Sequence, residues 1–538
     1  MKKIITVIYT LSFVIGAVSA QSVYDGVKIA DKDLNGTARF VGMGGAMGAL
    51  GGDITTMGTN PAGIGIYRSN DLMTSFSYSA YGMESKYEGQ KSTIDKNRWS
   101  FDNIGVVFAT KIGNQTPLRY VNFGFNYKRS KSFYKNMSMS GMMGVVENPS
   151  NPGSPYYVSQ TNSMALQATD AERYVWDNSR QHLDFDNANR IFSDPDAGWL
   201  GALGYQGGLT ERDRIDNEPD LYVPFLPVEP SSVFNSREKG GIDQYDFNVS
   251  FNINDRVYLG LTIGAYDVDY DKYSGYDESY KRGEGYSLES YNNISGSGFD
   301  VKMGLILRPF EYSPFRIGFA VHTPTFYKLT YSTSAIVTND YRDAKTDELK
   351  RIIVDTYDYV GDMKRDYRLV TPWKYNVSLG YTVGTSLALG AEYEYEDYST
   401  MKFKYSSNDG GGDMEFENAE VKNCLKGEHT FRIGAEYKVI PEFAFRLGYN
   451  YSSAVFRDEA VKYIPSNSLI TDTDFSNKRS QSNYTLGIAY QLSTYKENFY
   501  PFYNEFELTQ GEWTMVTPPA TKVTNTRSQV LLTVGMRF

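Results

Sequence analysis

The sequence predicts an all-β fold, a transmembrane antiparallel β-barrel of about 14 strands. Three observations carry this prediction. Apolar and polar side chains alternate with a period of two over most of the chain, the connections between alternating stretches are in turn very short and very long, and the final stretch ends on the aromatic residue Phe538.

Residues 1–20 have the composition of a secretory signal peptide. Two lysines begin the stretch, an apolar run follows, and small residues end it at a cleavage site. We therefore expect an exported protein whose mature chain starts near Gln21. Because that residue is not a cysteine and Cys424 is the single cysteine, we expect neither a lipid anchor nor an intramolecular disulfide.

The composition excludes helical membrane spans and argues against nucleic-acid binding. After residue 20 no run approaches the roughly 20 apolar residues that a membrane helix needs, and the mean hydropathy is -0.45. The chain of 538 residues contains 45 Tyr and 30 Phe, as the aromatic girdles of a membrane barrel require. A net charge of -10 is the wrong sign for a nucleic-acid partner.

The segment from Asn35 to Arg68 precedes the alternating pattern and lacks it. It is rich in Gly, Ala, Thr and Met and almost free of charge in its middle, so it suits packing in a confined space. Pro61 fixes its own φ and pushes Asn60 out of the helical region, so the turn Asn60-Pro61-Ala62-Gly63 ends the segment sharply. A nucleotide-binding loop is excluded, because Met47 stands where a G-x-G-x-x-G pattern needs its third glycine.

The alternation that follows defines the strands. In residues 121–127 one face carries Val, Phe, Phe and Tyr while the other carries Asn, Gly and Asn. A soluble sandwich would also alternate, but strands of about 10 residues and unequal connections favour a membrane barrel. Thirteen strands are predicted at 71–81, 102–110, 119–129, 244–254, 256–268, 298–308, 314–334, 366–383, 385–404, 429–439, 442–452, 481–492 and 527–538.

The two ends of the predicted barrel differ in the length of their connections. Short turns are expected at 254–255, 383–386 and 439–442, and long loops at 129–243, 269–297 and 453–480. Short periplasmic turns and long extracellular loops are typical of outer-membrane barrels. If both chain ends lie on the periplasmic side the strand number is even, which predicts a fourteenth strand at 499–509.

Several stretches resemble the FadL/TodX family of outer-membrane transporters. They are the signal peptide, the Gly-rich segment with its Asn60-Pro61-Ala62-Gly63 turn, His322-Thr323-Pro324, Thr371-Pro372-Trp373 with Ser378-Leu379-Gly380-Tyr381, and residues 443–450. The resemblance implies an N-terminal hatch or plug in the lumen over 21–68 and a barrel over 69–538 with a large extracellular loop at 130–243. It also implies passive uptake of hydrophobic compounds, of long-chain fatty acid or aromatic type, which leave the barrel laterally through a gap in its wall. The expected location is the outer membrane of a Gram-negative bacterium.

The partners expected from this resemblance are a hydrophobic small-molecule ligand and outer-membrane lipid. We also expect barrel-assembly machinery to recognise the C-terminal strand ending in Phe538, and we expect a monomer without a cofactor. A surface receptor or adhesin-like barrel that binds haem or a protein through its long loops is the alternative. An enzyme is not expected, because no Ser-His constellation lies on one strand face.

Two sets of site residues are predicted. The hatch motif comprises Asn60, Pro61, Ala62, Gly63, Gly42, Gly44 and Gly45. Candidate lumen contacts for a ligand are Arg316, His322, Arg432 and Arg446, whose arginines could hold a carboxylate. The competing hypothesis pairs those arginines with Glu392, Glu394, Glu436 or Asp53. No metal site is expected, because the three histidines, His182, His322 and His429, lie far apart in the sequence.

Overall fold

The computed structural model describes residues 21–143, 145–147, 155–214, 216–225, 230–440, 443–487, 490–509, 512–516 and 518–538. The predicted signal peptide at 1–20 lies outside the described residues, as do 144, 148–154, 215 and 226–229 of the predicted large loop. Within the described ranges no helix is both long and apolar enough to cross a membrane.

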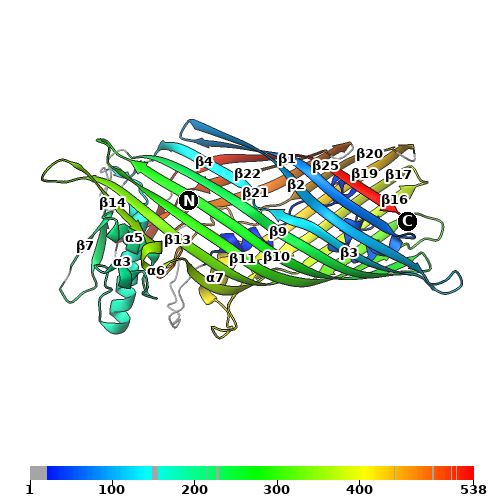
Figure 1. Ribbon diagram of the computed structural model, residues 1–538, viewed down its shortest axis with the longest axis horizontal. Coiled ribbons are helices and arrows are strands. Elements are labelled where there is room, and N and C mark those ends of the chain that lie inside the picture. Colours follow the sequence, from blue (N-terminus) through cyan, green and yellow to red (C-terminus); the bar gives the residue numbers. More distant parts are fainter. Residues whose placement is uncertain are drawn as a thin grey trace.

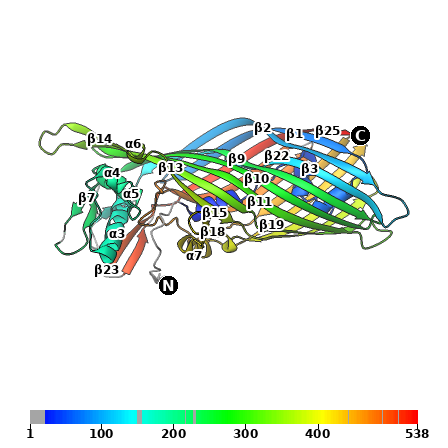
Figure 2. The same cartoon turned by 60° about the horizontal axis from the view of Figure 1, so that its bottom comes forward.

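The main body is a closed antiparallel β-barrel of 14 strands, as the sequence predicts (Figures 1 and 2). Each strand pairs with its neighbour along the chain, and the pairing of the first strand with the last closes the wall. Eleven strands are continuous, namely β1 (Asp71–Tyr87), β2 (Gln90–Lys111), β3 (Leu118–Ser132), β9 (Ser231–Ile253), β10 (Val257–Ser279), β11 (Gly285–Leu307), β19 (Gly427–Ile440), β20 (Phe443–Ser452), β21 (Phe475–Gly487), β22 (Tyr490–Tyr500) and β25 (Thr521–Arg537).

The other three wall strands are interrupted. β11 pairs with both β12 and β13, and these pair in turn with β16 and β15, so each pair of short strands continues one wall position. The interrupted strands are β12 (Arg316–His322) with β13 (Phe326–Arg342), β15 (Met363–Val370) with β16 (Lys374–Val383), and β17 (Leu387–Asp397) with β18 (Lys402–Tyr405). The first two breaks contain Pro324 and Pro372, which lack the N–H that a ladder needs.

The predicted strand count is right, but two of the predicted strands are wrong. The expected strand at 481–492 is a hairpin in which β21 ends at Gly487 and β22 begins at Tyr490. The expected strand at 499–509 is not a wall strand, because residues 499 and 500 end β22, and β23 (Asn504–Thr509) pairs with β24 (Glu512–Val516) in a separate sheet. Apolar residues keep the same parity from 484 to 490, so the alternation does not indicate that one strand ends at Gly487 and the next begins at Tyr490.

The predicted loop at 130–243 is shorter than expected, because the flanking strands extend beyond the alternating pattern. β3 continues to Ser132, and β9 already starts at Ser231. Their outer parts do not face lipid and therefore lack an apolar side. Between them lie β4 (Lys135–Met142), β5 (Val145–Glu147), β6 (Pro155–Tyr157), α3 (Thr161–Ser179), α4 (Ala188–Ile191), α5 (Trp199–Gln206), β7 (Thr210–Asp213) and β8 (Leu221–Pro224).

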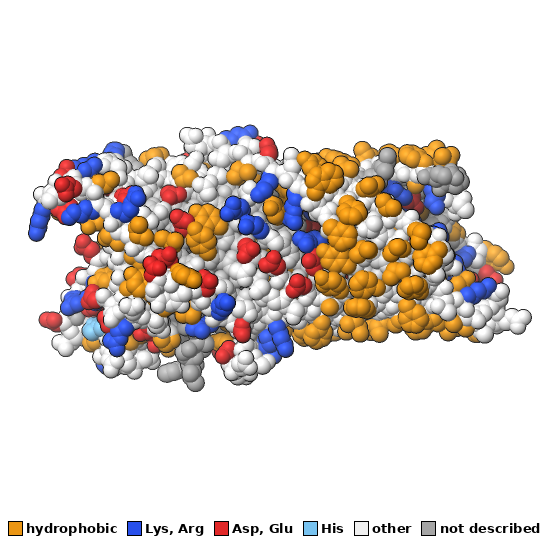
Figure 3. Space-filling model, viewed as in Figure 1, with side chains coloured by type: hydrophobic (Ala, Val, Ile, Leu, Met, Phe, Trp, Pro, Cys, Tyr) orange, Lys and Arg blue, Asp and Glu red, His pale blue; other side chains and the backbone are white. Residues whose placement is uncertain are grey.

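A belt of apolar side chains surrounds the half of the barrel that carries the short turns, which we call the short-turn end (Figure 3). Along β10 the outward positions change from apolar to acidic between residues 263 and 267, from Leu259, Leu261 and Ile263 to Asp267, Asp269 and Asp271. Aromatic rings contact one another along the far edge of the belt in the pairs Tyr78–Trp99, Phe101–Tyr127 and Phe299–Phe326. This apolar belt with its aromatic girdle makes the barrel a transmembrane one.

The N-terminal segment, residues 21–68, lies inside the barrel (Figure 2). It contains α1 (Val23–Ala30), α2 (Ala38–Gly42) and two short 3-10 helices, η1 (Ile54–Gly58) and η2 (Pro61–Ile66). α1 lies on the long-loop side of the belt, and the chain descends from it to β1 at the short-turn end. The remaining short elements are β14 (Leu349–Asp355), α6 (Thr356–Val360), η3 (Tyr398–Thr400) and α7 (Glu415–Cys424).

Candidate functional site

Glycines on the inner face of the wall let the N-terminal segment approach the strands backbone to backbone. A Cβ added at Gly260 would lie 2.2 Å from the carbonyl carbon of Pro61, and one at Gly390 would lie 2.1 Å from the carbonyl oxygen of Ala46. Adjacent strands present these glycines at matching register, as in the pair Gly390 and Gly434. The set comprises Gly260, Gly304, Gly318, Gly380, Gly390, Gly434 and Gly448. A glycine inside a strand is typical of close approach by another backbone.

The Asn60–Gly63 turn is buried in the centre of this contact. Asn60 Nδ2 donates to the carbonyl of Gly48 at 2.9 Å, and its Oδ1 accepts from the Ala62 amide at 3.2 Å. The carbonyl of Pro61 accepts from Ser250 Oγ of β9 at 2.8 Å. These bonds connect the turn to an earlier part of its own segment and to the wall.

Of the three predicted glycines of the motif, Gly42 and Gly44 lie against β20, and Gly45 lies against Arg432 of β19. Gly44 and Gly45 have φ values of +62° and +81°, which other residues adopt at a cost. The carbonyl of Gly42 accepts from Thr485 Oγ1 at 2.9 Å. The structure thus places six of the motif residues in the interface between segment and wall, while Gly63 packs against Thr56 and Gly51 of its own segment. The role of all seven in gating stays a prediction.

The four candidate ligand residues lie in the same interface. Arg316 Nη1 donates to the carbonyl of Leu50 at 2.7 Å, and His322 Nε2 is 2.7 Å from the carbonyl oxygen of Thr59. Arg432 pairs with Glu392 at 2.5 Å and Glu394 at 2.8 Å, and Arg446 pairs with Glu436 at 2.7 Å. Asp53 bonds within the N-terminal segment, to Thr37 and Thr55. Contact of these four residues with a ligand stays a prediction.

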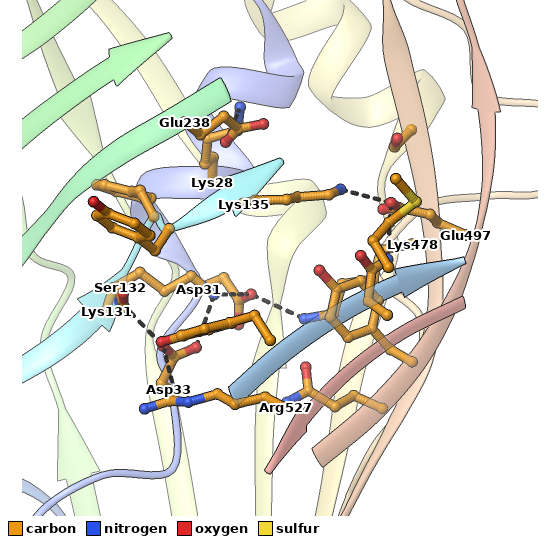
Figure 4. Close-up of a pocket in the computed structure, with 18 of the residues that line it drawn as sticks. Lys28, Asp31, Asp33, Lys131, Ser132, Lys135, Glu238, Lys478, Glu497 and Arg527 are labelled. Atoms are coloured by element: carbon orange, nitrogen blue, oxygen red, sulfur yellow. Dashed lines mark hydrogen bonds and ion pairs between the residues drawn. The ribbon is translucent and has the colours of Figure 1, made fainter. Parts of the chain in front are cut away.

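A cavity of about 240 Å³ lies on the long-loop side of this filled region, and its lining includes none of those four residues (Figure 4). Its floor is formed by Asp31 and Asp33, which follow α1. Asp31 pairs with Lys131 of β3 at 2.7 Å and with Lys478 of β21 at 3.0 Å. Asp33 pairs with Lys131 at 3.1 Å and with Arg527 of β25 at 3.5 Å. Two carboxylates therefore connect the N-terminal segment to three separate strands.

Further ion pairs line the walls of the cavity. Lys135 of β4 pairs with Glu497 of β22 at 2.6 Å, and Lys272 of β10 pairs with Asp472 at 2.8 Å. Burial raises the pKa of Asp472, but Lys272 and Lys462 outweigh it and bring that pKa down to about 2. The carboxylate is therefore charged throughout the physiological range.

Aromatic and aliphatic side chains share this cavity with the charges. Tyr24 of α1 stacks on Phe456 with ring centroids 4.7 Å apart, and Phe133 and Phe475 also line the space. A surface that offers both apolar rings and paired charges suits a ligand with an apolar body and a polar end.

The barrel wall has a break in its ladder beside the cavity. β2 pairs with β3 only up to Asn103 and Lys128, while the outer part of β2 pairs with β1 alone among the described residues. Ile94 and Lys96 of β2 and Tyr134 of the β3–β4 corner line the cavity at this break. The break begins directly after Asn103, so Trp99 and Phe101, at the edge of the belt, lie on the part of β2 that is not paired with β3. The cavity therefore reaches the wall at a place where β2 and β3 are not joined by a ladder.

The structure brings one histidine close to two carboxylates, which the sequence spacing did not predict. His182 Nδ1 lies 2.5 Å from Glu172 of α3 and 3.7 Å from Asp220, which precedes β8. The ring of Trp176 contacts that of His182 in a tilted arrangement, with a centroid distance of 4.8 Å. We interpret this group as a polar link between α3 and β8.

Sequence reasoning missed the cavity residues, including Asp31, Asp33, Lys131 and Arg527. One available signal is that Arg129 and Lys131 continue β3 with charged residues just after the apolar alternation ends. A second signal is the repeated glycine at lumen-facing positions of seven strands, which predicts close contact with another backbone.

No protein-family model matches the chain, and no curated protein matches it by sequence. Solved structures similar to it include a FadL homologue from Pseudomonas aeruginosa, with 11% identity, a TM-score of 0.42, and coverage of 93% of this chain and 98% of that chain. The toluene transporter TodX of Pseudomonas putida has 9% identity, a TM-score of 0.40 and coverage of 93% and 98%. The toluene transporter TbuX of Ralstonia pickettii has 12% identity, a TM-score of 0.39 and coverage of 94% and 99%.

Proposed function

We propose that this protein mediates passive uptake of hydrophobic compounds across the outer membrane of a Gram-negative bacterium, in the manner of the FadL/TodX transporters. The observation that carries the proposal is the position of the cavity. The cavity lies on the long-loop side of the filled part of the lumen, beside the break in the wall at the edge of the apolar belt.

In this proposal the N-terminal segment acts as a plug. Asn60, Ala62 and Ile64 have no exposed surface, and the wall glycines leave no space around them for a ligand. A compound that enters the cavity from the long-loop end therefore meets a closed axis. Lateral release between β2 and β3 is the route that we assign to it.

The cavity supports a ligand that is apolar over most of its length. Tyr24, Phe133, Phe456 and Phe475 provide ring surfaces, and burial of apolar surface contributes about 25 cal/mol per Å² to binding. Long-chain fatty acids and aromatic compounds both meet this requirement.

Mass spectrometry of the purified protein tests the proposal. We expect an apolar or amphiphilic small molecule to remain with the folded protein through purification and to be released on unfolding. The variant Val27→Trp, which fills part of the cavity, is expected to retain less of it, and a detergent-only sample is the blank. Absence of any such compound, with no uptake of added long-chain compounds into vesicles, would contradict the proposal.

The surface-receptor alternative has one observation in its favour. The long-loop region contains a packed unit of α3, α5 and β7–β8 around buried Phe185, Trp199 and Leu203 (left in Figure 1). Tight binding of haem or a protein to this unit, together with an empty cavity, would favour the receptor. Retention of an amphiphile by a variant that lacks residues 158–225 would favour transport.

A further inference from the structure

Two basic side chains of β2 stand at the break in the wall. Lys96 and Arg98 point to the lumen side of the strand, while Asp95, Asn97 and Trp99 between and beside them are exposed. Both cations lie over one ring, that of Tyr134 at the β3–β4 corner. Lys96 Nζ is 4.7 Å and Arg98 Cζ is 4.3 Å from its centroid.

Lys96 differs from the other cations that line the cavity, because each of them has a carboxylate partner. These pairs are Lys28–Glu238, Lys131–Asp31, Lys135–Glu497, Lys272–Asp474, Lys462–Asp472, Lys478–Asp31 and Arg527–Asp33. Among the described residues, neither Lys96 nor Arg98 has a carboxylate within 4 Å, and the ring of Tyr134 is the partner that both share.

The carboxylates nearest to the break along the wall are already engaged. Asp33 pairs with Lys131 and Arg527, and Asp243 pairs with Arg129 at 2.8 Å. Asp102 accepts from Asn35 Nδ2 and from Ser100 Oγ, each at 3.0 Å, through Oδ1; its Oδ2 has no hydrogen-bond partner among the described residues and forms no ion pair with Lys96 or Arg98. Two half-buried positive charges are therefore left beside one ring without an anion from the protein.

We propose that Lys96, Arg98 and Tyr134 form a seat for the anionic head group of an amphiphile. The inference rests on the proposed function and assigns its ligand class, an amphiphile with a carboxylate or phosphate head. A guanidinium binds such a group through two parallel hydrogen bonds, and an ammonium adds a second positive charge. The seat lies just beyond the aromatic girdle, where head groups lie when the apolar chain is in the membrane.

The same position connects the cavity to the membrane. Behind the seat, Ile94 and Phe133 line the cavity, and in front of it Trp99 and Phe101 belong to the apolar belt. A head group held at Lys96 and Arg98 keeps its charge paired while the acyl chain of the ligand moves from the apolar surface of the cavity to that of the belt. The seat thus selects anionic amphiphiles over neutral hydrocarbons.

The test measures binding of a long-chain fatty acid and of its methyl ester to full-length protein in a neutral detergent. Loss of a charge-assisted contact lowers affinity by about 10- to 100-fold. We expect the double variant Lys96→Gln/Arg98→Gln to show this loss for the acid and none for the ester. Lys111→Gln, which removes the same kind of charge from the far end of β2, is the matched control and should bind both ligands normally.

A swap that keeps both charges guards against a merely structural effect. Lys96→Arg/Arg98→Lys should restore most of the affinity for the acid. Native mass spectrometry covers the second source of the head group. An anionic lipid that is retained by the wild type and lost from the double Gln variant also supports the seat, and then assigns it to a lipid of the surrounding leaflet.

The proposal is overturned if the double Gln variant binds acid and ester as the wild type does and retains the same lipids. It is also overturned if acid and ester weaken equally, because the charges would then act through folding. Wild-type protein that binds the ester but shows no advantage for the acid refutes the seat and leaves transport standing. Wild-type protein that binds neither ligand and retains no lipid refutes the seat and the proposed function together.

Discussion

The lumen is filled in one way at the short-turn end, here called its lower part, and in another way on the long-loop side, its upper part. In the lower part, within the apolar belt, residues 36–68 contact the wall through backbone atoms and glycines, and the hydrogen bonds of Asn60 and Pro61 are satisfied at short range. In the upper part, residues 21–35 are connected to the wall largely by ion pairs around a cavity. Backbone packing leaves no space for a ligand, whereas ion pairs around open space can be exchanged for a ligand.

The largest effect is expected from breaking the lower contact. In Gly260→Val the new side chain would overlap Pro61, because even a Cβ would lie 2.2 Å from its carbonyl carbon. Overpacking of this kind costs about 1–3 kcal/mol, and the N-terminal segment should lose its close contact with the wall. We expect a lower unfolding temperature and ion leakage in planar bilayers.

The matched control for this variant is Gly412→Ala. Gly412 lies in a loop, and a Cβ there would meet nothing within 4 Å. It should therefore leave stability and conductance unchanged. If Gly260→Val behaved like this control, the close approach of segment and wall would not constrain the lumen.

An intermediate effect is expected in the upper part from Asp33→Asn. The change leaves Arg527 without a carboxylate and Lys131 with Asp31 alone. Loss of a charged partner in a partly buried site costs about 1–3 kcal/mol. Ligand retention should fall while bilayers stay sealed, because the lower contact is intact; leakage as large as that of Gly260→Val would remove the distinction between the two parts.

Asp347→Asn is the control for the upper part. Asp347 pairs with Arg282 at 2.6 Å in an exposed loop, and exposed pairs contribute about 0–1 kcal/mol. Neither ligand retention nor the midpoint of unfolding should change measurably. A loss of ligand in this variant would indicate a general charge effect.

The smallest effect is expected from acid. Asp472 has a pKa of about 2 in the folded protein, below the value of about 3.9 in an unfolded chain. A lowered pKa stabilises the fold above the unfolded value, and this contribution, on the order of 2 kcal/mol, is lost as the pH falls through the folded value. In denaturant titrations, the difference in stability between the wild type and Asp472→Asn should therefore stay constant down to about pH 4 and decline toward pH 2.

The fold could be predicted from the sequence because lipid imposes a strict pattern on it. Outward positions such as those of β10 are apolar within the belt, and tight turns such as Asn254-Asp255, with φ values of 53° and 56°, separate the strands. The hairpin at Gly487 was missed because parity continues through it. The outer parts of β3 and β9 were missed because no lipid faces them.

The site was less predictable, because its residues meet only in the closed barrel. Asp33 and Arg527 are 494 positions apart and form an ion pair. Alternation shows that a charged residue such as Arg316 faces the lumen. It does not show the residue's position along the barrel axis or which residue pairs with it. Glycines at matching register, such as Gly390 and Gly434, indicate where along the barrel axis the N-terminal segment contacts the wall.

The central claim is that the N-terminal segment closes the lumen, and deletion of residues 36–63 tests it most directly. The variant is reconstituted in planar bilayers after its barrel has been verified by heat-modifiable electrophoretic mobility, with the wild type measured alongside. The account predicts a water-filled pore with stable single-channel conductance where the wild type shows none. A folded deletion variant with the same conductance as the wild type would contradict it.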